Sequence, residues 1–253
     1  MLIPLKRMVE HRHLYTPDYY ATLQQGFDNR SPRVLRRIGR IAEYLHLSPE
    51  DVILETGCGP GTTASALASF CRRVVAADYM PLAVELARQR NLPSNVDLLC
   101  ADLAHLPYPG GTFEKIIFSE VVEHLEEPAI VLRELFRVLK PGGLMAVTTW
   151  PSRACISWWL RYRQGQGSEQ DFNPQSPGSL KRLLRQAGFE ILQMQLNGFY
   201  FRVPLLGREF YGDPDGTPRQ RFLESLLRGP WAPLFAASIK IQAMRPINSG
   251  GRR

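Results

Sequence analysis

The 253-residue sequence has little cysteine, and its cysteines are widely spaced. The four residues Cys58, Cys71, Cys100 and Cys155 form no C-x-x-C pair. This spacing suggests neither a disulfide framework nor a zinc site.

Long apolar runs are also missing. No stretch approaches the roughly 20 apolar residues that a membrane-spanning helix needs. The start, "MLIPLKRMVEHRHLY", has no continuous apolar region and no small-residue cleavage site typical of a secretory signal. We therefore expect a cytoplasmic protein. Its net charge of +7 would suit nucleic acid, anionic lipid or an acidic substrate without choosing among them.

What the sequence does contain is an alternation of β-rich runs and helical patterns. Strands are expected at residues 52–55, 74–78, 96–100, 115–119, 144–149, 189–195 and 237–246, and helices at residues 64–70, 80–90, 129–139 and 179–187. The alternation predicts an α/β, Rossmann-like fold with about seven mostly parallel strands and helices on both faces.

Two kinds of segment lie outside the alternation. Residues 1–48 read as an N-terminal helical lid over a ligand-binding domain at 49–253. Within that domain, residues 150–175 and 197–231 are rich in aromatic residues, Arg, Gly and Pro, with weak periodicity. We expect these two segments to act as lids or substrate segments.

The segment "ETGCGPG" occupies the first strand-to-helix turn, where open α/β sheets bind their ligands. A dinucleotide fingerprint needs G-x-G-x-x-G, but here the third glycine comes one residue early, at Gly61. No Gly-Lys-Ser/Thr follows, which excludes a Walker loop. Glu55 would repel a pyrophosphate and would favour a ligand with ammonium and sulfonium charges. Phosphate binding is therefore not the favoured interpretation.

The next two predicted strands also end in carboxylates. Asp78 could accept hydrogen bonds from both ribose hydroxyls, and Asp102 one from an adenine amino group, with Leu103 near the ring. Each aspartate alone is more often a helix cap or turn residue. Their succession at strand ends favours a nucleoside site.

These pieces together resemble the class I S-adenosylmethionine-dependent methyltransferases. The matching stretches are "VILETGCGPG", "VVAADYM", "ADLAHLPYPGGTFEKIIFSEVVEHL", "LRELFRVLKPGGLMAVTTW" and "SLKRLLRQAGFEI", in family order over about residues 50–195. The resemblance implies that residues 49–253 form the catalytic domain and that S-adenosylhomocysteine is the product. It implies a cofactor site made of Glu55, Gly57, Cys58, Gly59, Gly61, Asp78, Tyr79, Met80, Ala101, Asp102, Leu103, Ser119 and Glu120.

The segment "SEVVEH" places Glu120, Glu123 and His124 at i, i+3 and i+4, on one face if the segment is helical. In one interpretation a glutamate caps a turn and the histidine packs near the cofactor. In the other, the three residues hold Mg²⁺ or another divalent metal, or His124 is a general base. A similar E-x-x-E-H segment is a metal site in ubiquinone-biosynthesis O-methyltransferases, which the sequence resembles more weakly.

The class of methyl acceptor is narrowed mainly by the absence of nucleic-acid-binding motifs from the sequence. No Asp/Asn-Pro-Pro-Tyr motif follows the fourth strand, and no RNA-binding module is recognised, so we expect no nucleic-acid partner. The stretch "ACISWWLRYRQGQG" mixes aromatic residues with arginines, a composition that suits an apolar pocket or peripheral contact with an anionic membrane. Tyrosines 15, 19 and 20 and the aromatic residues 199–201 could close the pocket.

The sequence therefore predicts a methyltransferase for a hydrophobic or aromatic small molecule, with oxygen as the preferred target. N- or C-methylation of a metabolite or lipid and a non-catalytic cofactor-binding protein stay open as alternatives. The sequence indicates no oligomeric state.

Overall fold

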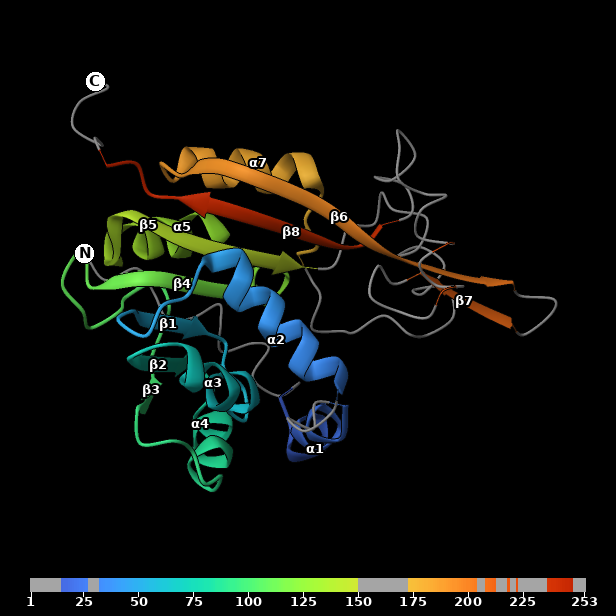
Figure 1. Ribbon diagram of the computed structural model, residues 1–253, viewed down its shortest axis with the longest axis horizontal. Coiled ribbons are helices and arrows are strands. Elements are labelled where there is room, and N and C mark those ends of the chain that lie inside the picture. The colour runs from blue at the N-terminus through green and yellow to red at the C-terminus, as the bar shows by residue number, and fades with distance from the viewer. Residues whose placement is uncertain are drawn as a thin grey trace.

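The computed structural model describes residues 15–26, 32–149, 173–203, 208–212 and 236–247, together with Pro218 and Phe222. In this part of the chain, eight strands form one sheet in the order β3-β2-β1-β4-β5-β8-β6-β7 (Figure 1). The strands are β1 (Val52–Thr56), β2 (Arg73–Asp78), β3 (Val96–Cys100), β4 (Phe113–Ser119), β5 (Leu139–Thr149), β6 (Glu190–Val203), β7 (Arg208–Gly212) and β8 (Ala236–Met244).

The sheet is parallel from β3 through β5. Beyond β5, each further pairing, with β8, then β6, then β7, is antiparallel. The predicted α/β sheet of about seven mostly parallel strands is confirmed, and β7 is a short additional strand at one edge. Residues 197–203, which the sequence assigned to a lid or substrate segment, continue β6 and pair with β7. Figure 1 shows this pair extending beyond the rest of the sheet.

The helices begin and end at sequence signals. They are α1 (Pro17–Gly26), α2 (Pro32–Leu45), α3 (Thr62–Leu67), α4 (Pro81–Arg88), α5 (Pro128–Val138) and α7 (Pro177–Gln186), with short 3₁₀ turns η2 (Ala68–Phe70) and η3 (Val122–His124). Proline starts α4, α5 and α7, where its missing N–H costs no helical hydrogen bond. Ser176 and Ser179 cap α7 reciprocally, each side chain bonding the other's backbone N–H.

The two faces of the sheet bury two separate apolar clusters. Alternate residues of a strand point to opposite faces, so Ile116 and Phe118 join one cluster while Ile117 joins the other. Helices α5 and α7 cover the first cluster, and α2 and α3 cover the second. Helices therefore lie on both faces of the sheet, as the sequence predicted.

The parallel strands bring their carboxyl ends to one edge of the sheet. The strand order reverses between β1 and β4, the place where open α/β sheets bind ligands. The glycine turn follows β1, and "SEVVEH" begins at the end of β4. The fold thus places most of the candidate site residues at this edge.

Some expected features lie outside the described residues. These include residues 150–172, with the "ACISWWLRYRQGQG" stretch, and residues 1–14 of the N-terminal lid. Helices α1 and α2 belong to the described part of that lid. Among the described helices, none is long and apolar enough to cross a membrane.

Candidate active site

The glycine turn adopts backbone conformations that require glycine. Gly57, Gly59 and Gly61 have φ angles of +65°, +52° and +77°, a region that disfavours residues with a Cβ. A Cβ on Gly57 would lie 2.6 Å from Cγ2 of Val121, so this turn packs directly against the "SEVVEH" segment. A Cβ on Gly59 would meet no atom within 4 Å. The turn is therefore open at Gly59, where a ligand can approach the backbone.

Asp78 connects the glycine turn to the start of α4. Its Oδ2 accepts a hydrogen bond from the Gly59 N–H and its Oδ1 one from the Met80 N–H, both at 2.8 Å. Burial raises the pKa of Asp78 above its ordinary value, although these backbone donors oppose the rise. A carboxylate has about four acceptor sites, so each Asp78 oxygen keeps capacity for a ribose hydroxyl. The ends of β2 and β3 are also joined here, because the Ala101 N–H, just after β3, donates a hydrogen bond to the Asp78 carbonyl at 3.0 Å.

Two further predicted cofactor residues are buried beside the glycine turn. Glu55, at 5% exposure, lies in β1, and Cys58, at 6%, lies within the turn. Burial raises the pKa of the Cys58 thiol well above its usual range, and the carboxylates of Glu55 and Asp78 act in the same direction. Cys58 therefore stays a neutral thiol at physiological pH and is not a nucleophile.

Asp102 is a turn residue in the structure. Its Oδ1 accepts the Ala104 N–H at 2.9 Å, and its Oδ2 lies 3.6 Å from Nδ1 of His105. Leu103 is buried in the apolar cluster under α5. The α5 residue Glu134 supports the same loop by accepting the Leu106 N–H at 2.8 Å. The adenine contact of Asp102 and Leu103 stays a prediction.

The "SEVVEH" segment runs from the end of β4 into the 3₁₀ turn η3, and it separates the two glutamates. Thr148 donates its hydroxyl to Oε1 of Glu120 at 2.8 Å, while Thr149 donates its hydroxyl to Oε2 of Glu123 at 2.9 Å. Neighbouring strand residues point to opposite faces of a sheet, so the two carboxylates are held on opposite sides of the β5 end. Glu123 is only 1% exposed.

This arrangement corrects the predicted metal site. Glu120, Glu123 and His124 are all described, yet no group of three His, Cys, Asp or Glu residues in the described part of the chain is arranged to hold a metal ion. The prediction assumed a helix with one common face. The positive φ of Glu120, +56°, and the short 3₁₀ turn prevent that face from forming.

His124 ends the same turn and contacts Tyr15, which lies just before α1. Its ring centroid is 6.4 Å from that of Tyr15, edge to face, and Tyr15 and Tyr20 both contact Tyr19 in the same manner. Tyr20 is 2% exposed, and its pKa is raised by burial and by the Asp78 carboxylate. The structure thus places α1 against the carboxyl edge of the sheet. The aromatic residues 199–201 belong to β6, and their part in closing the pocket stays a prediction.

Sequence reasoning missed the two threonines at the end of β5. Thr148 and Thr149 carry no motif that distinguishes them from ordinary strand residues. Their role depends on the register between β4 and β5, in which Ser119 is opposite Thr148.

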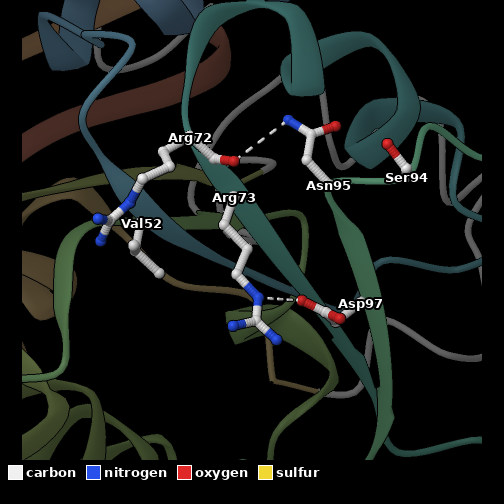
Figure 2. Close-up of a pocket in the computed structure, with 6 residues that line it drawn as sticks. All are labelled: Val52, Arg72, Arg73, Ser94, Asn95 and Asp97. Atoms are coloured by element: carbon white, nitrogen blue, oxygen red, sulfur yellow. Dashed lines mark hydrogen bonds and ion pairs between the residues drawn. The ribbon is translucent and has the colours of Figure 1, made fainter.

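A separate pocket of about 510 Å³ lies at the opposite edge of the sheet (Figure 2). It is lined by Val52, Arg72, Arg73, Ser94, Asn95 and Asp97. Arg73 pairs with Asp97, and the Asn95 amide donates to backbone carbonyls, including that of Arg72. Because it is formed at the amino ends of β1, β2 and β3, this pocket is not the candidate active site.

Comparison with known proteins matches residues 54–147 to the family described as "Methyltransferase domain". A Mycobacterium tuberculosis protein named "Probable S-adenosylmethionine-dependent methyltransferase" is 32% identical over 205 residues, covering 78% of this chain and 69% of the relative. A Mycolicibacterium smegmatis protein with a similar name is 35% identical over 144 residues, covering 55% of this chain. The aligned part spans about half of that second relative, 52% of its length.

Solved structures share the architecture. An S-adenosylmethionine-dependent methyltransferase of Aquifex aeolicus superposes with a TM-score of 0.60 at 18% identity, covering 91% of this chain and 99% of that one. At 18% sequence identity, this similarity shows a shared fold only.

Proposed function

The chain belongs to the S-adenosylmethionine-dependent methyltransferases, and from this membership we propose that it methylates a hydrophobic or aromatic small molecule at oxygen. The observation that carries the proposal is the contact of His124 with Tyr15, just before α1, at the carboxyl edge of the sheet. S-adenosylhomocysteine is the second product.

The residues of the glycine turn fit the cofactor. The turn is open at Gly59, and Asp78 is fixed beside it with acceptor capacity for the ribose. The buried Glu55 provides negative potential for the cationic methionine end. When bound, S-adenosylmethionine supplies a methyl group activated by its sulfonium, which leaves the protein to align the acceptor with that methyl group.

We assign the methyl acceptor to the part of the edge where the rings of two tyrosines lie beside the His124 imidazole. Tyr15 and Tyr19 offer apolar faces for a flat acceptor, and His124 lies in edge contact with Tyr15. A phenol has a pKa near 10, so removing its proton at pH 7 costs about 4 kcal/mol. We propose that His124, as general base, accepts this proton.

The direct test is incubation with S-adenosylmethionine and a panel of phenols, amines and lipid extracts, followed by measurement of S-adenosylhomocysteine. Product formed from phenols supports O-methylation. Turnover confined to amines or to carbon nucleophiles would favour the alternative acceptors. Cofactor binding without any turnover would point to a non-catalytic protein.

The role of His124 is tested by His124→Ala. We expect a roughly 100-fold or greater fall in kcat, typical of losing a general base, with the affinity for S-adenosylhomocysteine changed less than about twofold. Isothermal titration and single-turnover assays separate the two quantities. His46→Asn is the matched control, because His46 is an exposed residue at the end of α2 with a φ of +51°, which Asn tolerates. A parallel loss of cofactor binding in His124→Ala would contradict the base assignment.

Further parts of the proposal concern the surroundings of the site. We propose that three segments act as lids or substrate segments: residues 1–48, 150–175 and 197–231. We also propose that the protein works in the cytoplasm and contacts the membrane peripherally through residues 154–167. The composition of this last stretch, rich in Trp and Arg, supports the contact. Co-sedimentation with anionic liposomes at varied salt tests it, and absence of binding at low salt would rule it out.

A further inference from the structure

Glu120 has a backbone conformation that non-glycine residues rarely adopt. Its φ is +56°, and among the described residues only His46 shares this property. A left-handed conformation costs a non-glycine residue about 1–2 kcal/mol. Such strain persists where the surroundings hold the residue, and it is concentrated at functional sites. Here the Glu120 N–H is fixed by the Thr148 carbonyl at 2.8 Å.

The side chain of Glu120 is held by one oxygen only. Thr148 donates its hydroxyl to Oε1 at 2.8 Å, and the hydroxyls of Ser119 and Thr148 lie 2.7 Å apart. A hydroxyl has a single hydrogen to donate. Since Thr148 gives its hydrogen to Glu120, Ser119 must donate to Thr148. The two hydrogen bonds therefore form a chain with one donor direction: Ser119 donates to Thr148, and Thr148 donates to the Glu120 carboxylate.

The other oxygen of Glu120 is a buried acceptor without a donor. Within the described residues, Oε2 is buried and forms no hydrogen bond. Leaving a buried polar atom unsatisfied costs about 1–3 kcal/mol, and more when the group is charged. A donor from a bound ligand would remove this cost.

The position of Glu120 indicates which ligand that is. It follows β4, its carboxylate is tied to β5, and the neighbouring Val121 packs against Gly57. The predicted ribose and adenine residues lie on the far side of Gly57, at the ends of β2 and β3. Glu55 is a buried carboxylate of β1, the strand that leads into the glycine turn. Glu120 thus lies at the part of the edge left for the methyl acceptor.

We propose that Glu120 positions the methyl acceptor, with Oε2 accepting a hydrogen bond from an O–H or N–H of that molecule. The proposal rests on the proposed function, because it requires an acceptor beside the cofactor. A buried group built to bind a donor strongly rejects analogues without one. Glu120 would therefore determine specificity for hydroxylated over fully etherified acceptors.

The test uses catechol and 1,2-dimethoxybenzene as probes for the complex of the full chain with S-adenosylhomocysteine. We expect the wild type to bind catechol at least tenfold more tightly than the dimethoxy probe in isothermal titration. Glu120→Gln should abolish this preference, because its amide donor replaces Oε2, and should change S-adenosylhomocysteine affinity less than threefold. Glu127→Gln is the matched control, an exposed residue at the start of α5, and should keep the preference.

A second variant separates positioning from a structural role. Glu120→Gly relieves the positive φ, so its midpoint of thermal unfolding should not fall by more than a few degrees, yet it too should lose the preference for catechol. Thermal destabilisation with the preference retained would overturn the proposal.

Two other results have distinct meanings. A wild-type complex that does not prefer catechol, or a tenfold loss of S-adenosylhomocysteine affinity in Glu120→Gln, would overturn the assignment of Oε2 to the acceptor. Failure of the wild type to bind S-adenosylhomocysteine at all would instead overturn the proposed function.

Discussion

The two sides of the carboxyl edge hold their carboxylates by different means. On the side of β2, both oxygens of Asp78 are fixed by main-chain N–H groups, those of Gly59 and Met80. On the side of β5, Glu120 is fixed through one oxygen by a side-chain hydroxyl, that of Thr148. Main-chain donors survive nearly every substitution, whereas a hydroxyl is lost by a single one. Under the proposed function, cofactor recognition thus rests on backbone donors and acceptor recognition on exchangeable side chains.

The largest effect is expected from Gly57→Ala, because Gly57 lies in the glycine turn and packs against Val121, next to Glu120. The new Cβ would combine a φ of +65° with a 2.6 Å approach to Val121. We expect a loss of about 2–4 kcal/mol in the free energy of unfolding, measured by chemical denaturation.

Gly59→Ala is the matched control for that variant. Its φ is +52°, but its Cβ would meet no atom within 4 Å. Only the backbone strain of about 1–2 kcal/mol should remain. Equal losses in the two variants would show that the contact with Val121 is unimportant.

A second variant sharpens the contrast between the two carboxylates. Asp78→Asn keeps the shape but replaces one acceptor oxygen with a donor, which opposes a backbone N–H. We expect S-adenosylhomocysteine to bind about 10- to 100-fold more weakly, the effect of losing hydrogen bonds to a charged group. Titration calorimetry measures this against Glu120→Gln. Similar losses of affinity in both variants would remove the distinction between the two sides.

The smallest expected effect concerns the support of the β3 loop by α5. Hydrogen bonds from Arg137 lower the pKa of Glu134 below its ordinary 4.5, although burial opposes them. The ionised form therefore stabilises the folded state above about pH 4.5, and this contribution is lost as the pH falls through the folded pKa.

We accordingly expect Glu134→Gln to lower the free energy of unfolding by about 1 kcal/mol or less at pH 7. The difference from the wild type should shrink on acidification below pH 4.5. Urea denaturation across this range checks the prediction, and a difference that grows at low pH would contradict it.

Much of the geometry around the glycine turn could be predicted from the sequence. The early third glycine at Gly61 argued against a dinucleotide, and the structure gives all three glycines positive φ angles. The carboxylates at the ends of successive strands could be placed together because parallel strands end at one edge. Asp102 was harder to interpret, since a turn aspartate and a ligand-binding one look alike in sequence, and here it forms a turn.

The acceptor side could be predicted only in part. The spacing of Glu120, Glu123 and His124 suggested one common face and a metal site, but Glu120 has a left-handed backbone and only Val122–His124 form a 3₁₀ turn. The threonines that separate the glutamates lie 28 and 26 residues further along the chain. No local sequence pattern predicts hydrogen-bond partners that are so far apart in the chain.

By itself, the sequence determined which groups follow the parallel strands in turn: the glycine turn, Asp78, Asp102 and the "SEVVEH" segment. It could do so because strand and turn signals are local, and parallel strands then collect their carboxyl ends at one edge. The tertiary structure alone decided where the side chains of that last turn point. Thr148 and Thr149 are consecutive residues of β5 and so point to opposite faces of the sheet, the pairing of β4 with β5 brings the segment after Ser119 beside them, and hydrogen bonds from these hydroxyls hold Glu120 and Glu123 apart.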